Sequence, residues 1–250
     1  MQLGELSAYL DEYLRVREIP DHASALNGVQ VESSREIRRI AVAVDAVQGT
    51  IDAAVREGAD LLLVHHGLFW DGNQPVAGRR YRRLRALLAA DLAVYSAHLP
   101  LDVHPEVGNN AVLARMLAME VQGSFGSYKG HSLGLWGTLD VRREALCARL
   151  DELLGSRVRM IPGGPERVRR VGIVSGGAGD MIHAARAAGL DSFITGEGDH
   201  HHFFDAEEGE INLFFGGHYA TEVWGVQALA QHLEQRFGLA WSFIDHPTGL

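Results

Sequence analysis

The chain has 250 residues, of which 46% are hydrophobic and 22% charged, proportions typical of a globular protein with one large or two small domains. Its formal net charge of −9 argues against a nucleic-acid-binding surface, because phosphate contacts require clustered lysines and arginines. Cys147 is the only cysteine, so an intrachain disulfide and a thiolate-rich zinc cluster are excluded. No signal-like start or membrane-length apolar run is present, and we therefore expect a cytoplasmic protein whose metals, if any, are held by histidines and carboxylates.

Hydrophobic spacing predicts alternating helices and strands through the first half of the chain. Each buried strand is a short apolar run, and each helix shows apolar residues at helical spacing. In chain order we expect a helix over Leu3–Val16, a strand over Ile40–Val44, a helix over Gly49–Glu57, a strand over Leu61–Val64, a basic helix over Arg79–Ala90, a strand over Leu92–Ser96 and a helix opening at Asn109.

The segment Ala59–Trp70 is the one around which we expect the chain to be organised. Its apolar run Leu61–Val64 is typical of a strand buried on both faces, and it ends at His65, His66 and Gly67. Neighbouring side chains of a strand point to opposite faces, so the chain is expected to turn at the histidines if both serve one site. Two imidazoles at a strand end indicate a metal site; the alternative is a pair of hydrogen-bonded loop histidines.

The second half of the chain repeats this order of elements. When Ile40 is aligned with Val171 without gaps, a strand, a turn, a helix, a glycine and another strand follow in both halves. The identical pairs are Ile51/Ile182, Ala53/Ala184, Ala54/Ala185, Gly58/Gly189, Asp60/Asp191 and Gly67/Gly198. The alignment predicts an internal repeat, and we expect an α/β fold of two related lobes, residues 1–125 and 126–250.

Each half also contains a histidine that is followed four residues later by a carboxylate. His98 precedes Asp102 in the first half, and His218 precedes Glu222 in the second. If a helix begins at His218, this spacing places its imidazole and the carboxylate on one face. Pro100 makes the first copy less helical, so Asp102 is alternatively expected to extend from a loop.

These side chains outnumber the ligands of a single ion. Four imidazoles and two carboxylates exceed the roughly four ligands that one zinc ion takes. Two divalent ions in the cleft between the lobes fit the surplus better. Nitrogen and oxygen ligands suit Zn, Fe, Mn, Co or Ni, and they do not select among these metals.

Five ordered segments resemble the Nif-three-like (YbgI-like) family of dinuclear-metal proteins, many of which are labelled GTP cyclohydrolase 1 type 2 homologue. The segments lie between Asn27 and about Val226, and they read N-G-V-Q-V-E, L-L-V-H-H-G-L-F-W, S-A-H-L-P-L-D-V-H-P-E-V-G-N-N, S-G-G-A and G-H-Y-A-T-E-V-W-G-V. The resemblance implies two related α/β lobes and a hexameric, ring-like assembly. It also implies a set of metal ligands, which are His65, His66, Asp102, His218 and Glu222.

Within that family pattern Glu222 is expected to bridge the two ions, and His98 to lie beside the site. Glu197 is a candidate hydrogen-bond partner of a metal-bound histidine, and Glu197 and His98 are the candidates for proton transfer. His200–His202 either bind a further ion or form a solvated loop. Ser175–Gly179 forms either a tight turn or a phosphate-binding loop.

Two functions from different classes are compatible with these features. The favoured hypothesis is a metal-dependent hydrolase in which an activated water attacks a phosphoester or a purine-ring carbon of a small-molecule substrate such as a nucleotide. The alternative is a non-enzymatic ring protein that stores or delivers metal ions, or that acts as a scaffold or regulator. The basic segment Arg79–Arg83 either steers an anionic substrate or forms a solvated helix face.

Overall fold

The computed structural model describes all 250 residues, which form two compact α/β units. The first unit comprises Met1–Val107 and Gly225–His246, and the second comprises Gly108–Trp224 and Pro247–Leu250. This division differs from the expected one, because position 125/126 lies inside strand β5 (Glu120–Tyr128). After Trp224 the chain also returns to the first unit, which the local sequence pattern does not indicate.

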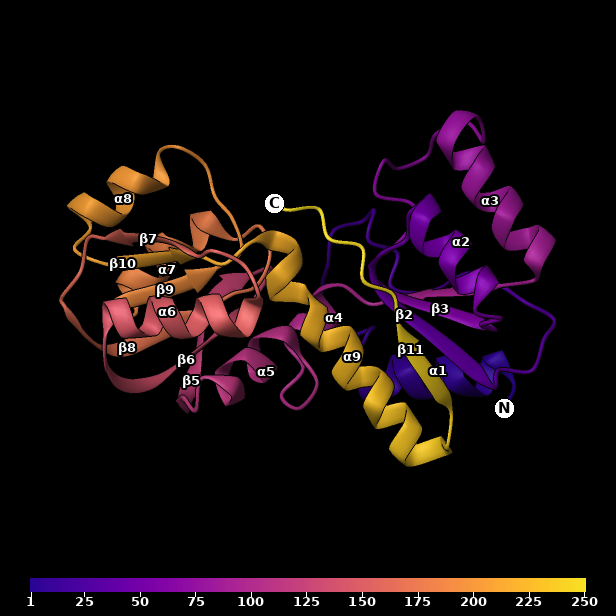
Figure 1. Ribbon diagram of the computed structural model, residues 1–250, viewed down its shortest axis with the longest axis horizontal. Helices are drawn as coiled ribbons and strands as arrows, with labels where there is room; N and C mark the ends of the chain where they lie inside the picture. The colour runs from indigo at the N-terminus through magenta and orange to yellow at the C-terminus, as the bar shows by residue number, and fades with distance from the viewer. The chain divides into compact units, whose positions relative to one another are not determined.

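The first unit is a five-stranded mixed sheet with helices on both faces (Figure 1). Its elements are α1 (Leu3–Tyr13), β1 (Gly28–Val31), β2 (Arg39–Asp45), α2 (Gln48–Arg56), β3 (Leu61–His66), α3 (Gly78–Ala90), β4 (Ala93–Ser96), α4 (Leu99–Asp102), the C-terminal part of α9 (His218–Phe237) and β11 (Ala240–Phe243). The strand order is β1-β4-β3-β2-β11. Only β1 runs antiparallel to its neighbour.

Alternating side chains of the central strands supply two separate cores in this unit. Ile40 and Val42 of β2 pack with α1 and the C-terminal part of α9, whereas Ala41 and Ala43 pack with α2 and α3. Because both faces are covered, β2, β3 and β4 are buried along nearly their whole length. This double coverage explains why their sequences are continuous apolar runs.

The second unit is a six-stranded mixed sheet of order β5-β6-β8-β9-β10-β7. Its elements are α5 (Asn109–Met116), β5, β6 (His131–Arg142), α6 (Arg143–Leu154), β7 (Arg159–Pro162), β8 (Arg167–Ile173), a 3-10 turn (Gly179–Met181), α7 (Ile182–Ala187), β9 (Ser192–Thr195), α8 (His202–Glu208) and β10 (Asn212–Phe215). Strands β8, β9 and β10 are parallel, and the other pairings are antiparallel. Helices α5 and α6 pack on one core of the sheet, and α7 and α8 on the other.

Most of the predicted elements are confirmed, with small shifts at their ends. The predicted helix Leu3–Val16 ends at Tyr13, because Arg15 adopts a left-handed conformation with φ of 54°. The helix expected from His218 is confirmed as α9, which has 20 residues. Neither α9 nor any other helix combines the length and the apolar character needed to cross a lipid bilayer.

A carboxylate makes the same pair of backbone hydrogen bonds in each sheet. Asp60 Oδ2 accepts the N–H groups of Arg38 and Arg39, at 2.9 and 3.0 Å. In the other sheet Asp191 Oδ2 accepts the N–H groups of Arg169 and Arg170, at 2.9 and 2.8 Å. Each aspartate lies at the start of a parallel strand and holds the beginning of the neighbouring strand.

Asp60→Ala is expected to lower the free energy of unfolding by about 1–3 kcal/mol, because it leaves two backbone N–H groups of a buried strand start without their acceptor. Urea unfolding followed by circular dichroism measures the loss. The matched control is Asp52→Ala on the exposed face of α2, which is expected to change the free energy of unfolding by no more than about 0.5 kcal/mol. Equal losses in both variants would contradict the assignment of this role to Asp60.

Candidate metal centre

The carboxyl ends of parallel strands position the predicted ligands of the first unit. Asp45 is the last residue of β2, His66 is the last of β3, and the two are register partners. His98 follows the end of the next strand, β4, by two residues. This edge is where open α/β sheets bind their ligands.

Strand β3 continues through His66, so the expectation that the chain turns at the histidines is wrong. The two rings nevertheless lie close together, with centroids 4.7 Å apart, because the strand ends there and both side chains extend past its edge. One potential ligand atom from each of His65, His66 and His98 lies within 4.8 Å of the others. The chain then passes so close to Gln30 that a Cβ on Gly67 would overlap the side chain of this glutamine.

Acceptors orient the imidazoles of His65 and His66. The Nδ1–H of His65 donates to the carbonyl oxygen of Ala97 at 2.9 Å. The Nδ1–H of His66 donates to Asp45 Oδ1 at 3.0 Å. Because a carbonyl and a carboxylate can only accept, these bonds fix the proton on Nδ1 and leave the lone pair on Nε2, the arrangement typical of metal-bound histidines.

Asp102 lies next to His65 at this edge. Its Oδ2 is 3.6 Å from His65 Nε2, and the aspartate is only 7% exposed. Asp102 is the last residue of the short helix α4, so it extends from a helix and not from a loop. Pro100 does not prevent this helix, because it occupies the first turn, where its missing N–H would have had no helical acceptor.

His98 forms a buried pair with Asp21. Its Nδ1–H donates to Asp21 Oδ1 at 2.9 Å, and Asp21 Oδ2 accepts from Asn27 and from the Leu99 N–H. Burial raises the pKa of Asp21, but the hydrogen bonds and charge of His98 outweigh it and hold this pKa below its ordinary value. Burial lowers the pKa of His98 below its ordinary value, although the hydrogen bond to Asp21 acts in the opposite direction. Because Nδ1 donates to Asp21, the neutral ring carries its lone pair on Nε2.

His218 and Glu222 form the corresponding pair of the second unit. They lie in the first turns of α9, and His218 Nε2 is 3.3 Å from Glu222 Oε2. Glu197, which follows the end of β9, accepts a hydrogen bond from His218 Nδ1 at 2.8 Å. Burial lowers the pKa of His218, but Glu222 and Glu197 outweigh burial and raise it to about 9 in the metal-free protein.

The segment Ser175–Gly179 forms a tight turn that packs against these side chains. Gly176 has φ of +70°, and a Cβ there would overlap the Oε1 atom of Glu222. The Gly176 carbonyl accepts the N–H groups of Gly196 and Glu197, at 2.9 and 3.1 Å. A phosphate at this turn would meet the Glu222 carboxylate, so the geometry favours the tight turn over a phosphate-binding loop.

The histidine-rich segment contributes a structural hydrogen bond. His202 is 2% exposed, its Nδ1 accepts the Asp199 N–H at 2.7 Å, and its Nε2 lies 2.9 Å from Asp180 Oδ1. Because Nδ1 accepts, the proton is on Nε2, which donates it to Asp180. His202 therefore has no lone pair for an ion, although Asp180, His201 and His202 lie close enough together to hold one.

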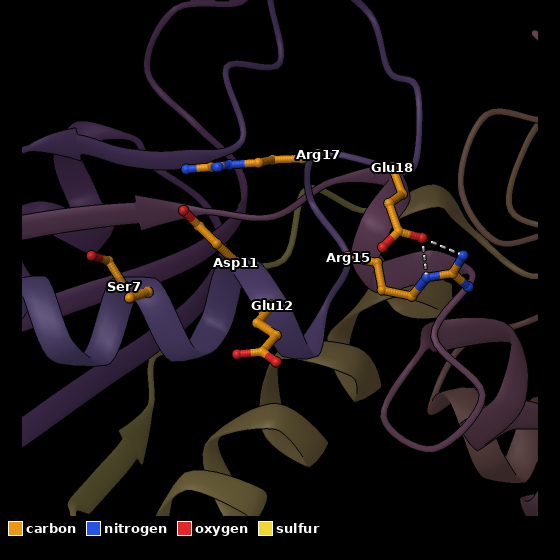
Figure 2. A pocket seen from close by; sticks show the side chains of 7 residues that line it. Ser7, Asp11, Glu12, Arg15, Arg17 and Glu18 are labelled. Atoms are coloured by element: carbon orange, nitrogen blue, oxygen red, sulfur yellow. Dashed lines mark hydrogen bonds and ion pairs between the residues drawn. The ribbon is translucent and has the colours of Figure 1, made fainter.

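A hollow of about 580 Å³ lies elsewhere in the first unit, along α1 and the turn that follows it (Figure 2). It is lined by both carboxylates and guanidinium groups, and Arg15 pairs with Glu18. Asp11 is held by the hydroxyl of Tyr95 at 2.8 Å. None of the predicted ligands lines this hollow, so it is separate from the candidate site.

The donor set fits divalent transition metals. His65, His66, Asp102 and His98 lie together in the first unit, and His218, Glu222 and Glu197 lie together in the second. All of the donor atoms are nitrogen or oxygen, and each imidazole is fixed through Nδ1 by an acceptor. No sequence pattern predicted that Asp45 and Asp21 orient histidines of the site. For Asp45, the one indication in the sequence was its position at the carboxyl end of a predicted strand.

The raised pKa of His218 predicts a pH dependence of the metal-free protein. Because the folded-state pKa of about 9 exceeds the ordinary value of 6.5, the pairing stabilises the fold below pH 6.5, and the contribution falls as pH rises through about 9. An NMR titration of the His218 ring is expected to show this pKa, and Glu197→Gln is expected to lower it. Glu207→Gln, an exposed carboxylate of α8, serves as the control. A His218 that titrates near 6.5 in both proteins would contradict the geometry.

Comparison with known proteins places this arrangement in a family. The family model described as Duf34/NIF3 (NGG1p interacting factor 3) matches residues 1–248. A Deinococcus radiodurans protein named GTP cyclohydrolase 1 type 2 homolog is 46% identical, and the match covers 98% of this chain and 94% of that protein. A protein of the same name from Archaeoglobus fulgidus is 42% identical, with both chains covered completely.

Solved structures agree with the fold. A structure described as protein ybgI, of unknown function, has a TM-score of 0.93 and 38% identity, with complete coverage of both chains. The protein TTHA1606 from Thermus thermophilus has a TM-score of 0.87 and 40% identity, again with complete coverage of both. With a family model that matches nearly every residue, and with relatives above 40% identity, the chain belongs to the Duf34/NIF3 family.

Proposed function

We propose that the protein binds two divalent metal ions and is a metal-dependent hydrolase that acts on a nucleotide or a phosphoester. One observation supports this most directly: all three histidines of the proposed ligand set have Nδ1 held by a carbonyl or a carboxylate, so that Nε2 can be presented to an ion. We propose His65, His66, Asp102, His218 and Glu222 as the ligands, with Glu222 as the bridging carboxylate.

The proposal requires the two units to contribute to one cleft. The equivalent hydrogen bonds of Asp60 and Asp191 support descent of the two units from one repeated segment. So do Gly58 and Gly189, which occupy matching positions with φ of 67° and 69°. In the first unit the proposed ligands lie at or after the carboxyl ends of β3 and β4, and in the second they follow the carboxyl end of β10, so a pseudo-twofold relation would bring two similar edges together.

The chain's own residues have distinct parts in the proposed reaction. Bound divalent ions would supply Lewis-acid activation of a water and of the electrophilic atom of the substrate. His98, oriented by Asp21 and with its pKa lowered by burial, would accept a proton at Nε2. Glu197 would fix the ring of His218 through Nδ1 and provide a second proton acceptor.

Two further points rest on the family alone. The name of the relatives, GTP cyclohydrolase 1 type 2 homolog, makes GTP ring opening one reaction to assay. The hexameric ring is supported only by family resemblance, and light scattering tests it, since a species of one or two chains would contradict it.

Metal content tests the ligand set. Protein purified without chelators is expected to contain about two ions per chain, and Glu222→Ala is expected to lose most of them, because a bridging carboxylate holds both ions. Inductively coupled plasma mass spectrometry measures the content. The control is Glu208→Ala, an exposed carboxylate of the second unit. Unchanged loading in Glu222→Ala would refute the bridge.

Hydrolysis by the metal-loaded protein tests the function. Assays with nucleotides, including GTP, and with phosphoesters are expected to show turnover that Asp102→Ala abolishes. His98→Gln is expected to lower kcat by about 10²–10⁴-fold while the metal content is preserved, because it removes the proton acceptor and not a ligand. The absence of turnover with every substrate, together with rapid transfer of the metal to an acceptor protein, would favour the metal-handling alternative.

A further inference from the structure

A small pocket in the first unit lies beside His66. Its cavity volume is about 140 Å³, and its lining includes His66, Trp70, Arg79 and Arg83. Pockets that enclose a whole drug-sized ligand measure about 300–1,000 Å³. This pocket is therefore large enough for one chemical group of a substrate and too small for a complete nucleotide.

Several hydrogen-bond donors at this pocket have no adequate acceptor. Arg83 is half-buried and makes no hydrogen bond or ion pair. The only ion pair of Arg79 is a 3.6 Å contact with Asp71. The indole N–H of Trp70 is buried without a partner. Arg79 is exposed to solvent, whereas the half-buried Arg83 lacks an acceptor within the protein, and this half-buried cation at a pocket indicates an anionic ligand.

Both carboxylates that line the pocket already accept hydrogen bonds from side chains of the protein. Asp45 accepts the hydrogen bond of His66, and Asp71 is held by the guanidinium of Arg80. Burial and repulsion by Arg79 lower the pKa of Arg83, and the charges of Asp71 and Asp45 offset this lowering only in part. An anion between Arg79 and Arg83 would relieve this repulsion.

The position of the arginines in the helix agrees with a binding role. Arg79, Arg80, Arg82 and Arg83 all lie in the first turns of α3, which begins at Gly78 without a side-chain cap. Positive side chains there oppose the positive end of the helix dipole, so helix stability does not explain them. Arg79 and Arg83 are four residues apart and therefore share a face of the helix.

We propose that this pocket binds a phosphate group of the substrate, with Arg79 and Arg83 pairing its oxygens. Guanidinium groups match phosphate with paired, charge-assisted hydrogen bonds. The inference rests on the proposed hydrolase function, because it takes His66 to mark the reacting end of the substrate. It assigns a binding position to one phosphate group of that substrate, and the rest of the substrate lies outside the pocket.

Binding of inorganic phosphate, measured by calorimetry on the metal-loaded full-length protein, tests the proposal. Arg83→Gln is expected to weaken binding about tenfold or more, because it removes a charge-assisted pair. Arg83→Lys keeps the charge and loses the paired geometry. Its affinity for phosphate is expected to lie between those of the wild type and Arg83→Gln. Arg82→Gln is the matched control, since this exposed arginine of the same helix does not line the pocket, and it is expected to change binding less than twofold.

Further measurements distinguish the possible outcomes of this test. Equal losses in Arg83→Gln and Arg82→Gln would overturn the proposal, and so would acetate binding as tightly as phosphate. Phosphate binding that requires the metal and ignores Arg83 would also overturn it. The metal content and the thermal unfolding of Arg83→Gln are expected to match the wild type. Arg83-dependent phosphate binding without any turnover would support the pocket and contradict only the hydrolase function.

Discussion

The hydrogen bonds at the Nδ1 atoms of four histidines are the interactions on which the candidate metal centre depends. Ala97, Asp45, Asp21 and Glu197 provide the acceptors, and three of them are carboxylates. Each bond fixes a ring orientation and places a proton on Nδ1, which leaves Nε2 as the atom that can bind a metal ion once any proton on it is lost. All four histidines lie at or just after the carboxyl end of a parallel strand, which makes the sheet edge the scaffold of the site.

The two units differ in the chemistry that they offer. The first supplies three imidazoles and one carboxylate next to a pocket containing Arg79 and Arg83. The second supplies one imidazole between two carboxylates, which raise the pKa of His218, whereas burial lowers that of His98. Similar topology thus presents a histidine with a lowered pKa in one unit and a histidine with a raised pKa in the other.

Local patterns predicted the main elements that contain the ligands, but not the short helix α4 that contains Asp102. The apolar runs before His65 and His98 predicted β3 and β4, and the spacing of His218 and Glu222 predicted the start of α9. The sequence pattern placed the second half of α9 in the second lobe, whereas it packs in the first unit. Hydrophobic periodicity identifies the buried face of a helix and not the sheet against which that face packs. The hairpin of β5 and β6 has half-exposed, glycine-containing strands, which give only a weak periodic signal.

The sequence by itself determined the family, the alternation of helices and strands, and the residue types that bind metals, since these depend on the order and spacing of side chains along the chain. Only the tertiary structure decided which acceptor holds each imidazole, because Asp21 and His98 are 77 residues apart in the chain. It also showed that His202 holds a loop and that Arg83 lies in a pocket with His66, since hydrogen bonding and burial depend on neighbours that the fold alone brings into contact.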